Sequence, residues 1–142
     1  MADSTYDLRR FISAQKQDYL TALEEIRRGR KRSHWMWYIF PQLRGLGMSS
    51  TSYFYGIESL EEARAFLDDP YLGGNLREIS QALLSLDTGD ARSVMGSPDD
   101  LKLRSSMTLF SLAAPEEPVF KKVLEKFYRG VQDPATLRIL GL

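Results

Sequence analysis

Four prolines of this chain follow residues that can cap a helix, and these pairs constrain the fold more than any other sequence feature. They are Asp69-Pro70, Ser97-Pro98, Asp133-Pro134 and, as a weaker version, Glu117-Pro118. An Asp or Ser side chain accepts hydrogen bonds from the free N–H groups at a helix start, where proline fits because it has no N–H. Each pair therefore predicts the beginning of a helix.

Apolar residues after these pairs recur three and four positions apart, which is the spacing of one helix face. This holds for residues 72–83, 101–110 and 119–127. Gly130 and Gly141 stand where two of these helices would end, since glycine readily adopts the left-handed conformation that follows a helix. The pattern is that of helices packed around a core.

The first helix is predicted over residues 6–28, where a similar apolar stripe runs. Ser4 or Thr5 could cap its start. Gly29 could end it, behind arginines that suit the negative end of the helix dipole.

Signals for β-strands are poor, because no Asn-Gly or Asp-Gly pair links two alternating runs. Residues 35–40 could be a buried strand by composition, but they have no obvious partner, and we expect a short helix capped by Ser33 and stopped by Pro41. Ser59 and Glu62 form a capping box that opens another short helix. We therefore predict an all-α fold, a single compact multihelical domain of about seven or eight short helices.

The chain has 142 residues and fits one domain over residues 1–142, with residues 1–5 expected to be flexible. Its formal net charge is zero, which argues against bulk attraction to nucleic acid or membranes. The absence of cysteine excludes disulfides, and a single histidine makes a zinc site unfavourable. The N-terminus has no apolar signal segment, and the longest apolar run is too short to span a bilayer. We expect a cytoplasmic protein.

The stretch KRSHWMWYIFPQ, residues 31–42, contains the only histidine and both tryptophans. It overlaps the end of the cationic run RRGRKR, residues 27–32. Cations there could bind phosphate while a tryptophan stacks on a base or a cation. The alternatives are a solvated helix end and ordinary core packing, since charge runs usually face solvent. The combination favours a pocket lined by this stretch.

The candidates for that pocket include the histidine and both tryptophans of the stretch. His34 is best suited to transfer protons near neutral pH, although a lone histidine can equally have a structural role. Trp35 and Trp37 would point to different faces of a helix, so that one enters the core and the other can line a cleft.

Two glycines and several hydroxyl residues, among them Ser50 and Tyr53, occupy residues 45–56. Backbone N–H groups at the start of a short helix here could bind an anion. The spacing matches neither a P-loop nor a dinucleotide fingerprint.

A second chemically rich stretch follows Ser97. Asp99 and Asp100 are favoured at a helix start by the dipole, and Asp100 with Lys102 could form an ion pair or a general acid–base pair. Ser105 and Ser106 would lie in the middle of this helix, where serine is poorly favoured unless it bonds a partner or a ligand.

Four blocks of the sequence resemble a known family: SHWMWYIFPQLRGLG, LDDPYLGGNLREISQALL, GSPDDLKLRSSMTLF and FYRGVQDPATLRIL. The chain resembles, from about residue 8 to residue 140, the uncharacterised and mainly bacterial domain of unknown function 1810. Its members are often labelled calpastatin, but calpain inhibitors are disordered alone, unlike a chain rich in core residues. The resemblance implies a mainly helical fold and no established activity.

A second stretch, LLSLDTGDARSVMGSPDD, is similar to one in the NADAR (NAD- and ADP-ribose-associated) superfamily, and SLEEARAFL has a counterpart there. The matching residues are Thr88, Gly89, Asp90, Ser97, Pro98 and Asp100. This resemblance implies a helical protein linked to hydrolysis of N-glycosidic bonds in nucleotide-derived substrates. The chain departs from that pattern, because it lacks the tryptophan-glycine pair after the aspartate and the early glutamate-histidine pair.

We therefore expect a pocket for a nucleotide-like small molecule, with no metal, no cofactor, no duplex nucleic acid and no membrane partner. The first hypothesis is a hydrolase, similar to an N-glycosidase, that acts on a phosphorylated ribosyl substrate. The alternatives are a binding module for a nucleotide or ADP-ribose and an interaction domain that uses an aromatic patch. The predicted catalytic residues are Asp100 and His34. The predicted substrate-binding residues are Lys31, Arg32, Trp35, Trp37, Gln42, Ser50, Tyr53, Lys102 and Ser106.

Overall fold

The computed structural model describes residues 6–142, and this part of the chain forms nine helices and no strand. The helices are α1 (Arg9–Arg27), α2 (Met36–Ile39), α3 (Ser50–Phe54), α4 (Leu60–Asp68), α5 (Pro70–Leu84), α6 (Ala91–Met95), α7 (Asp99–Ala113), α8 (Pro118–Tyr128) and α9 (Pro134–Leu140). The predicted all-α fold is confirmed. The short α3 lies between the two ends of an isolated parallel bridge that joins Leu43 and Ile57.

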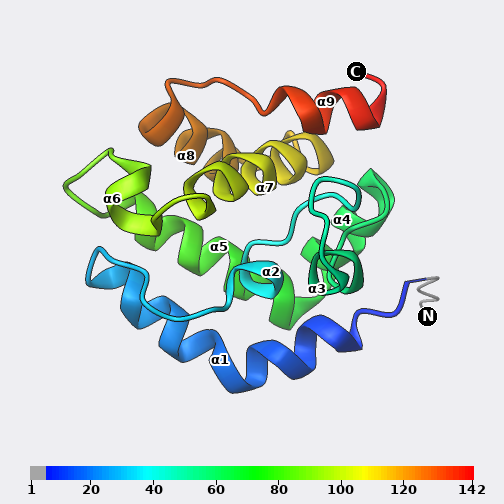
Figure 1. Ribbon diagram of the computed structural model, residues 1–142, viewed down its shortest axis with the longest axis horizontal. Coiled ribbons are helices and arrows are strands. Elements are labelled where there is room, and N and C mark those ends of the chain that lie inside the picture. Colours follow the sequence, from blue (N-terminus) through cyan, green and yellow to red (C-terminus); the bar gives the residue numbers. More distant parts are fainter. Residues whose placement is uncertain (1–5) are drawn as a thin grey trace.

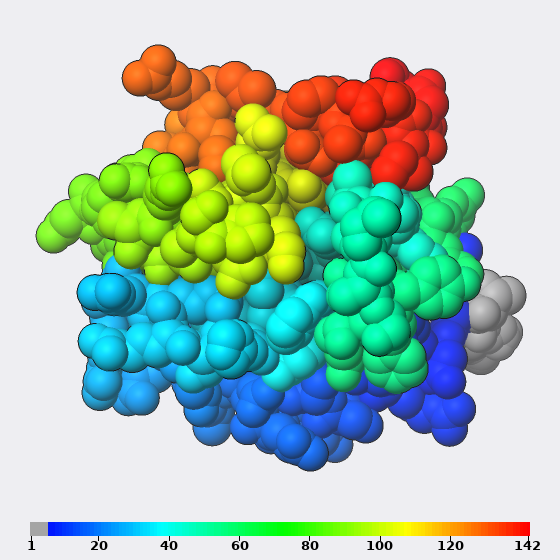
Figure 2. Space-filling view, in the orientation of Figure 1, coloured from blue at the N-terminus to red at the C-terminus, as the bar shows by residue number. Residues whose placement is uncertain are grey.

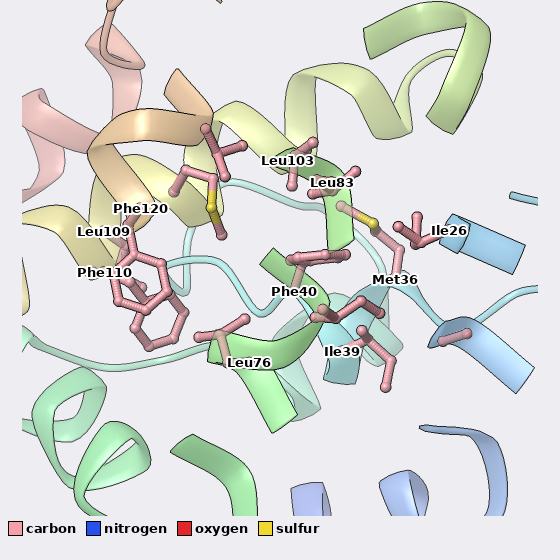
Figure 3. Packing of buried hydrophobic residues seen from close by; sticks show 14 of the residues in the cluster. Ile26, Met36, Ile39, Phe40, Leu76, Leu83, Leu103, Leu109, Phe110 and Phe120 are labelled. Atoms are coloured by element: carbon pink, nitrogen blue, oxygen red, sulfur yellow. The ribbon is translucent and has the colours of Figure 1, made fainter. Parts of the chain in front are cut away.

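Helices α5 and α7 lie in the middle of the molecule, between α1 on one side and α8 and α9 on the other (Figure 1). Helix α5 contacts α1, α4 and α8, while α7 contacts α4, α6, α8 and α9. Met36, Ile39 and Phe40, from α2 and its end, project among Leu76 and Leu83 of α5 (Figure 3). The aromatic stretch of the sequence therefore supplies one side of the core.

Two of the proline pairs cap helices as predicted. The Asp69 carboxylate accepts hydrogen bonds from the backbone N–H groups of Tyr71 and Leu72, at 3.0 and 2.9 Å. Helix α5 begins at Pro70, the residue directly after Asp69. Asp133 accepts from the backbone N–H of Thr136 at 3.0 Å, and α9 begins in the same way. These caps depend on residues within three positions, which is why the sequence alone predicts them.

The prediction that Ser97 caps a helix with Pro98 in its first position is wrong. Helix α7 begins one residue later, the Ser97-Pro98 peptide is cis, and no side chain caps the helix. The backbone N–H groups of Asp100 and Leu101 donate to the carbonyl oxygens of Gly96 and Pro98, at 2.9 and 3.0 Å. Those N–H groups are therefore not free to bond the Ser97 hydroxyl.

Two glutamates depart from the simplest capping scheme. Ser59 accepts from the Glu62 N–H at 3.1 Å, but the Glu62 carboxylate accepts from the N–H of Glu58 rather than Ser59, at 2.7 Å. Glu117 precedes α8 without capping it. Its carboxylate is instead bound by the guanidinium of Arg77, at 2.6 and 2.8 Å.

Helix α1 ends as predicted. Gly29 follows it with a φ of 82°, a conformation that side-chain-bearing residues rarely adopt. Its predicted start is wrong, because α1 begins at Arg9 rather than at residue 6, with Leu8 at the N-cap position and no side-chain cap. Ser4 and Thr5, its predicted capping residues, and the expected flexibility of residues 1–5 lie outside the described residues.

Candidate functional site

The segment before α2 meets the start of α7 and forms a pocket of about 250 Å³. These two segments lie side by side on the face shown in Figure 2, in light blue and yellow-green. The pocket is lined by Lys31, His34, Met36, Trp37, Ser97, Pro98 and Asp99. The structure thus brings together the two stretches that the sequence singles out for chemistry.

Lys31 is held tightly in the pocket wall. Its side chain is only 7% exposed, and its ammonium nitrogen lies 2.9 Å from Asp99 Oδ2. The same nitrogen donates to the carbonyl oxygen of Ser33 at 2.5 Å and lies 4.9 Å from the centre of the Trp35 ring. Two of its three N–H donors thus have oxygen partners, and the ammonium group also lies near an aromatic ring. Lys31 therefore positions Asp99 rather than facing a ligand.

Lys102 is bound more loosely beside the same carboxylate. Its ammonium nitrogen lies 3.7 Å from Asp99 Oδ1 and 5.6 Å from the centre of the Trp37 ring. Its side chain is 28% exposed, and His34 at the pocket rim is exposed as well. Lys102, His34 and the half-buried Trp37 are the groups with freedom to meet a ligand.

Glu25 of α1 fixes the backbone of this wall. Its Oε1 accepts hydrogen bonds from the N–H groups of Arg32 and Ser33, at 2.8 and 3.0 Å, and from Trp35 Nε1 at 2.8 Å. Its Oε2 accepts from the Ser33 hydroxyl at 2.5 Å. Burial raises the pKa of Glu25, but these hydrogen bonds outweigh it and lower the pKa to about 2. The carboxylate therefore stays ionised at neutral pH.

The sequence analysis missed Glu25, which stands in a charged part of α1 and resembles a solvated residue. The prediction of Ser33 as a helix cap is wrong. Helix α2 begins only at Met36, so Trp35 rather than Ser33 occupies the N-cap position, and the Ser33 hydroxyl donates to Glu25. Trp35 is the core tryptophan of the pair, at 1% exposure.

Asp100 does not line the pocket with His34. It neighbours Asp99, but successive side chains on a helix point about 100° apart. The Asp100 Oδ1 atom is buried without a hydrogen-bond partner, and its carbonyl oxygen accepts from the hydroxyl of Tyr128. The carboxylate that faces the pocket is therefore that of Asp99.

Seven of the nine predicted binding residues also lie outside the pocket lining: Arg32, Trp35, Gln42, Ser50, Tyr53, Lys102 and Ser106. Arg32 follows Lys31 of the lining in the chain, and Lys102 contacts Asp99 and Trp37 of the lining. Ser106 is fully buried, and its hydroxyl has no partner within residues 6–142. Gln42 is half-buried, while Ser50 and Tyr53 of α3 are both exposed. The ring of Tyr53 is covered by the guanidinium of Arg44, 4.3 Å from its centre.

The two mid-helix serines differ. Ser105 donates to Asp133 at 3.0 Å, which gives its place in the helix a structural reason. Ser106 lies seven residues after Asp99 and four after Lys102, so these three share one face of α7. Its unpartnered hydroxyl has no structural explanation.

Within residues 6–142, no three His, Cys, Asp or Glu side chains are grouped closely enough to hold a metal ion. The helices in the same part of the chain are too short or too polar to cross a membrane. The aromatic stretch also offers little surface to a partner protein, because Trp35 and Met36 are 1% and 2% exposed.

Comparisons with known proteins extend over the whole domain. The model of a family described as "Protein of unknown function (DUF1810)" matches residues 5–140. The crystal structure of the conserved hypothetical protein Rv1873 from Mycobacterium tuberculosis is similar, with 45% sequence identity and a TM-score of 0.95. The match covers 98% of this chain and 99% of that chain. No curated protein matches significantly. The resemblance to NADAR stays a prediction.

Proposed function

Since the chain belongs to the family described as "Protein of unknown function (DUF1810)", we propose a function from its pocket: the protein binds a small phosphorylated ribosyl compound there. One observation carries the proposal. Lys102 stands beside an aromatic face and a carboxylate that Lys31 already holds, and its ammonium group, 3.7 Å from that carboxylate, keeps N–H donors for an anion.

Charge and shape support this ligand class. Lys31 and Asp99 of the lining pair with each other, and Lys102 beside Asp99 adds an excess positive charge, which favours phosphate. The Asp99 carboxylate can accept hydrogen bonds from sugar hydroxyls, and the ring of Trp37 can stack on a planar group. The volume of about 250 Å³ lies below the range of about 300–1,000 Å³ that holds drug-sized ligands. A ribosyl phosphate fits this size better than a whole dinucleotide.

We expect ribose 5-phosphate or AMP to raise the melting temperature of the protein. A ligand at 100 times its dissociation constant adds about 2.7 kcal/mol, which corresponds to a rise of several degrees. The variant Lys102→Gln should lose this rise, because it removes the free cation. The matched control Lys121→Gln changes an exposed lysine on α8 and should keep it. An equal rise in both variants, or none in the natural protein, would rule the site out.

Hydrolysis is a second candidate, because Asp99 and His34 line the same pocket. In N-glycoside hydrolysis the C–N bond breaks, the water oxygen bonds to the sugar carbon, and a proton goes to the leaving nitrogen. A carboxylate stabilises the positive charge that develops on the sugar. The sequence assigns this role to Asp100, whereas the pocket geometry favours Asp99.

If a nucleoside phosphate is turned over, Asp99→Asn should lower kcat by at least about 100-fold, a typical effect of losing a charged group that acts in the transition state. Asp100→Asn should change kcat by less than about threefold, since its carboxylate does not face the pocket. Product formation is measured by chromatography. The melting temperature of each variant is compared with that of the natural protein to verify that the variant is folded. The opposite ranking would favour the assignment to Asp100, and binding without product would favour a binding module.

A further inference from the structure

The exposure of side chains alternates from residue 30 to residue 35. Arg30, Arg32 and His34 are exposed, while the side chains between and after them are half-buried or buried. The inward-pointing side chains are those that contact Asp99 and Glu25. The outward-pointing ones therefore share one side of the segment, and His34 among them lines the pocket.

The backbone that carries Arg32 is fixed in place. Its own N–H and that of Ser33 both donate to the Glu25 carboxylate, at 2.8 and 3.0 Å. Fixing a backbone before binding reduces the entropy that a ligand contact must overcome. The Arg32 guanidinium is therefore attached to a fixed backbone between Lys31 and His34, which both line the pocket.

The acidic groups near this rim are already engaged. The ion pairs are Arg27–Glu78, Arg28–Glu24, Lys31–Asp99 and Lys102–Asp99. Within residues 6–142, the side chains of Arg30 and Arg32 take part in no ion pair or hydrogen bond with the protein. Two guanidinium groups beside the pocket thus have no protein counterion.

We propose that Arg32, with Arg30 beside it, binds a second phosphate group of the ligand whose first phosphate is held at Lys102. The ligand class is then a ribosyl compound with a diphosphate, rather than a monophosphate. This inference rests on the proposed function of the pocket. The planar guanidinium suits the second phosphate, because it can donate two parallel hydrogen bonds to phosphate oxygens. The second phosphate lies outside the pocket itself, so the small volume does not exclude it.

The test compares AMP and ADP by titration calorimetry at constant ionic strength. The natural protein should bind ADP about tenfold more tightly than AMP, a typical gain for one charge-assisted contact. Arg32→Gln should reduce that ratio to below about threefold while leaving the AMP affinity within about twofold. Arg138→Gln, which changes an exposed arginine on α9, should leave both affinities unchanged.

The other outcomes separate this inference from the proposed function. Equal affinities for AMP and ADP in the natural protein would overturn the second phosphate site and leave the pocket intact. A loss of AMP binding in Arg32→Gln would also overturn it, because the arginine would then serve the first phosphate. Binding of neither nucleotide would overturn both proposals. Tighter binding of a short single-stranded oligonucleotide than of ADP would overturn the assignment to a small diphosphate.

Discussion

Replacing Glu25 with alanine should lower the free energy of unfolding by about 4 kcal/mol, because four donors lose a charged acceptor at once. Those donors are the N–H groups of Arg32 and Ser33, the Ser33 hydroxyl and the Trp35 indole N–H. The indole belongs to a side chain that is 1% exposed, so water cannot easily replace its partner. Urea denaturation at pH 7 measures the loss.

Glu25→Gln is the matched control, since its amide oxygen can still accept two of the three hydrogen bonds of Oε1. This variant should lower the free energy of unfolding by only about 1 kcal/mol.

The pKa of Glu25 falls from 4.5 to about 2 on folding. The ionised carboxylate therefore adds stability above about pH 4.5, and this contribution is lost as the pH falls toward 2. Denaturation at pH 7 and pH 3 should reveal this loss in the natural protein and a smaller loss in the glutamine variant. If both variants cost the same small amount, Glu25 does not organise the segment.

Replacing Arg10 with methionine should lower the free energy of unfolding by about 3–5 kcal/mol, the cost of leaving a buried charge unpaired. The Arg10 guanidinium lies 3.1 Å from Glu62, and their side chains are 14% and 3% exposed. Arg10 also donates to the carbonyl oxygens of Phe54 and Gly56, at 2.8 and 3.2 Å. These contacts attach the segment that contains α3 to α1. Thermal and urea denaturation measure the effect.

The double variant Arg10→Met with Glu62→Gln identifies the cause. A neutral glutamine can still accept the hydrogen bond from the Glu58 N–H, which Glu62 accepts at 2.7 Å. If the unpaired charge causes the loss, the double variant should be more stable than Arg10→Met alone. A double variant that is less stable would assign the loss to the missing carbonyl contacts instead.

The helix starts show where sequence reasoning succeeds. Asp69 and Asp133 cap their helices as predicted, because each bonds N–H groups two or three residues ahead. Ser97 and Ser33 look equally suitable in sequence. The N–H groups near Ser97 bond to backbone carbonyls, and the helix after Ser33 begins only at Met36, while the Ser33 hydroxyl donates to Glu25. A cap is predictable only when the helix starts directly after the capping residue and its first N–H groups are free.

The sequence alone determined the fold class, the core side of the long helices and the two stretches in which chemistry is concentrated. Each depends on residues within about four positions of one another, whose relative directions a helix fixes. Only the tertiary structure decided that Asp99 rather than Asp100 faces the pocket, that Lys31 is a structural cation, and that Glu25 holds the wall. These roles depend on where the segment before α2 meets α1 and the start of α7, and residue spacing does not reveal contacts between segments that are distant in the sequence.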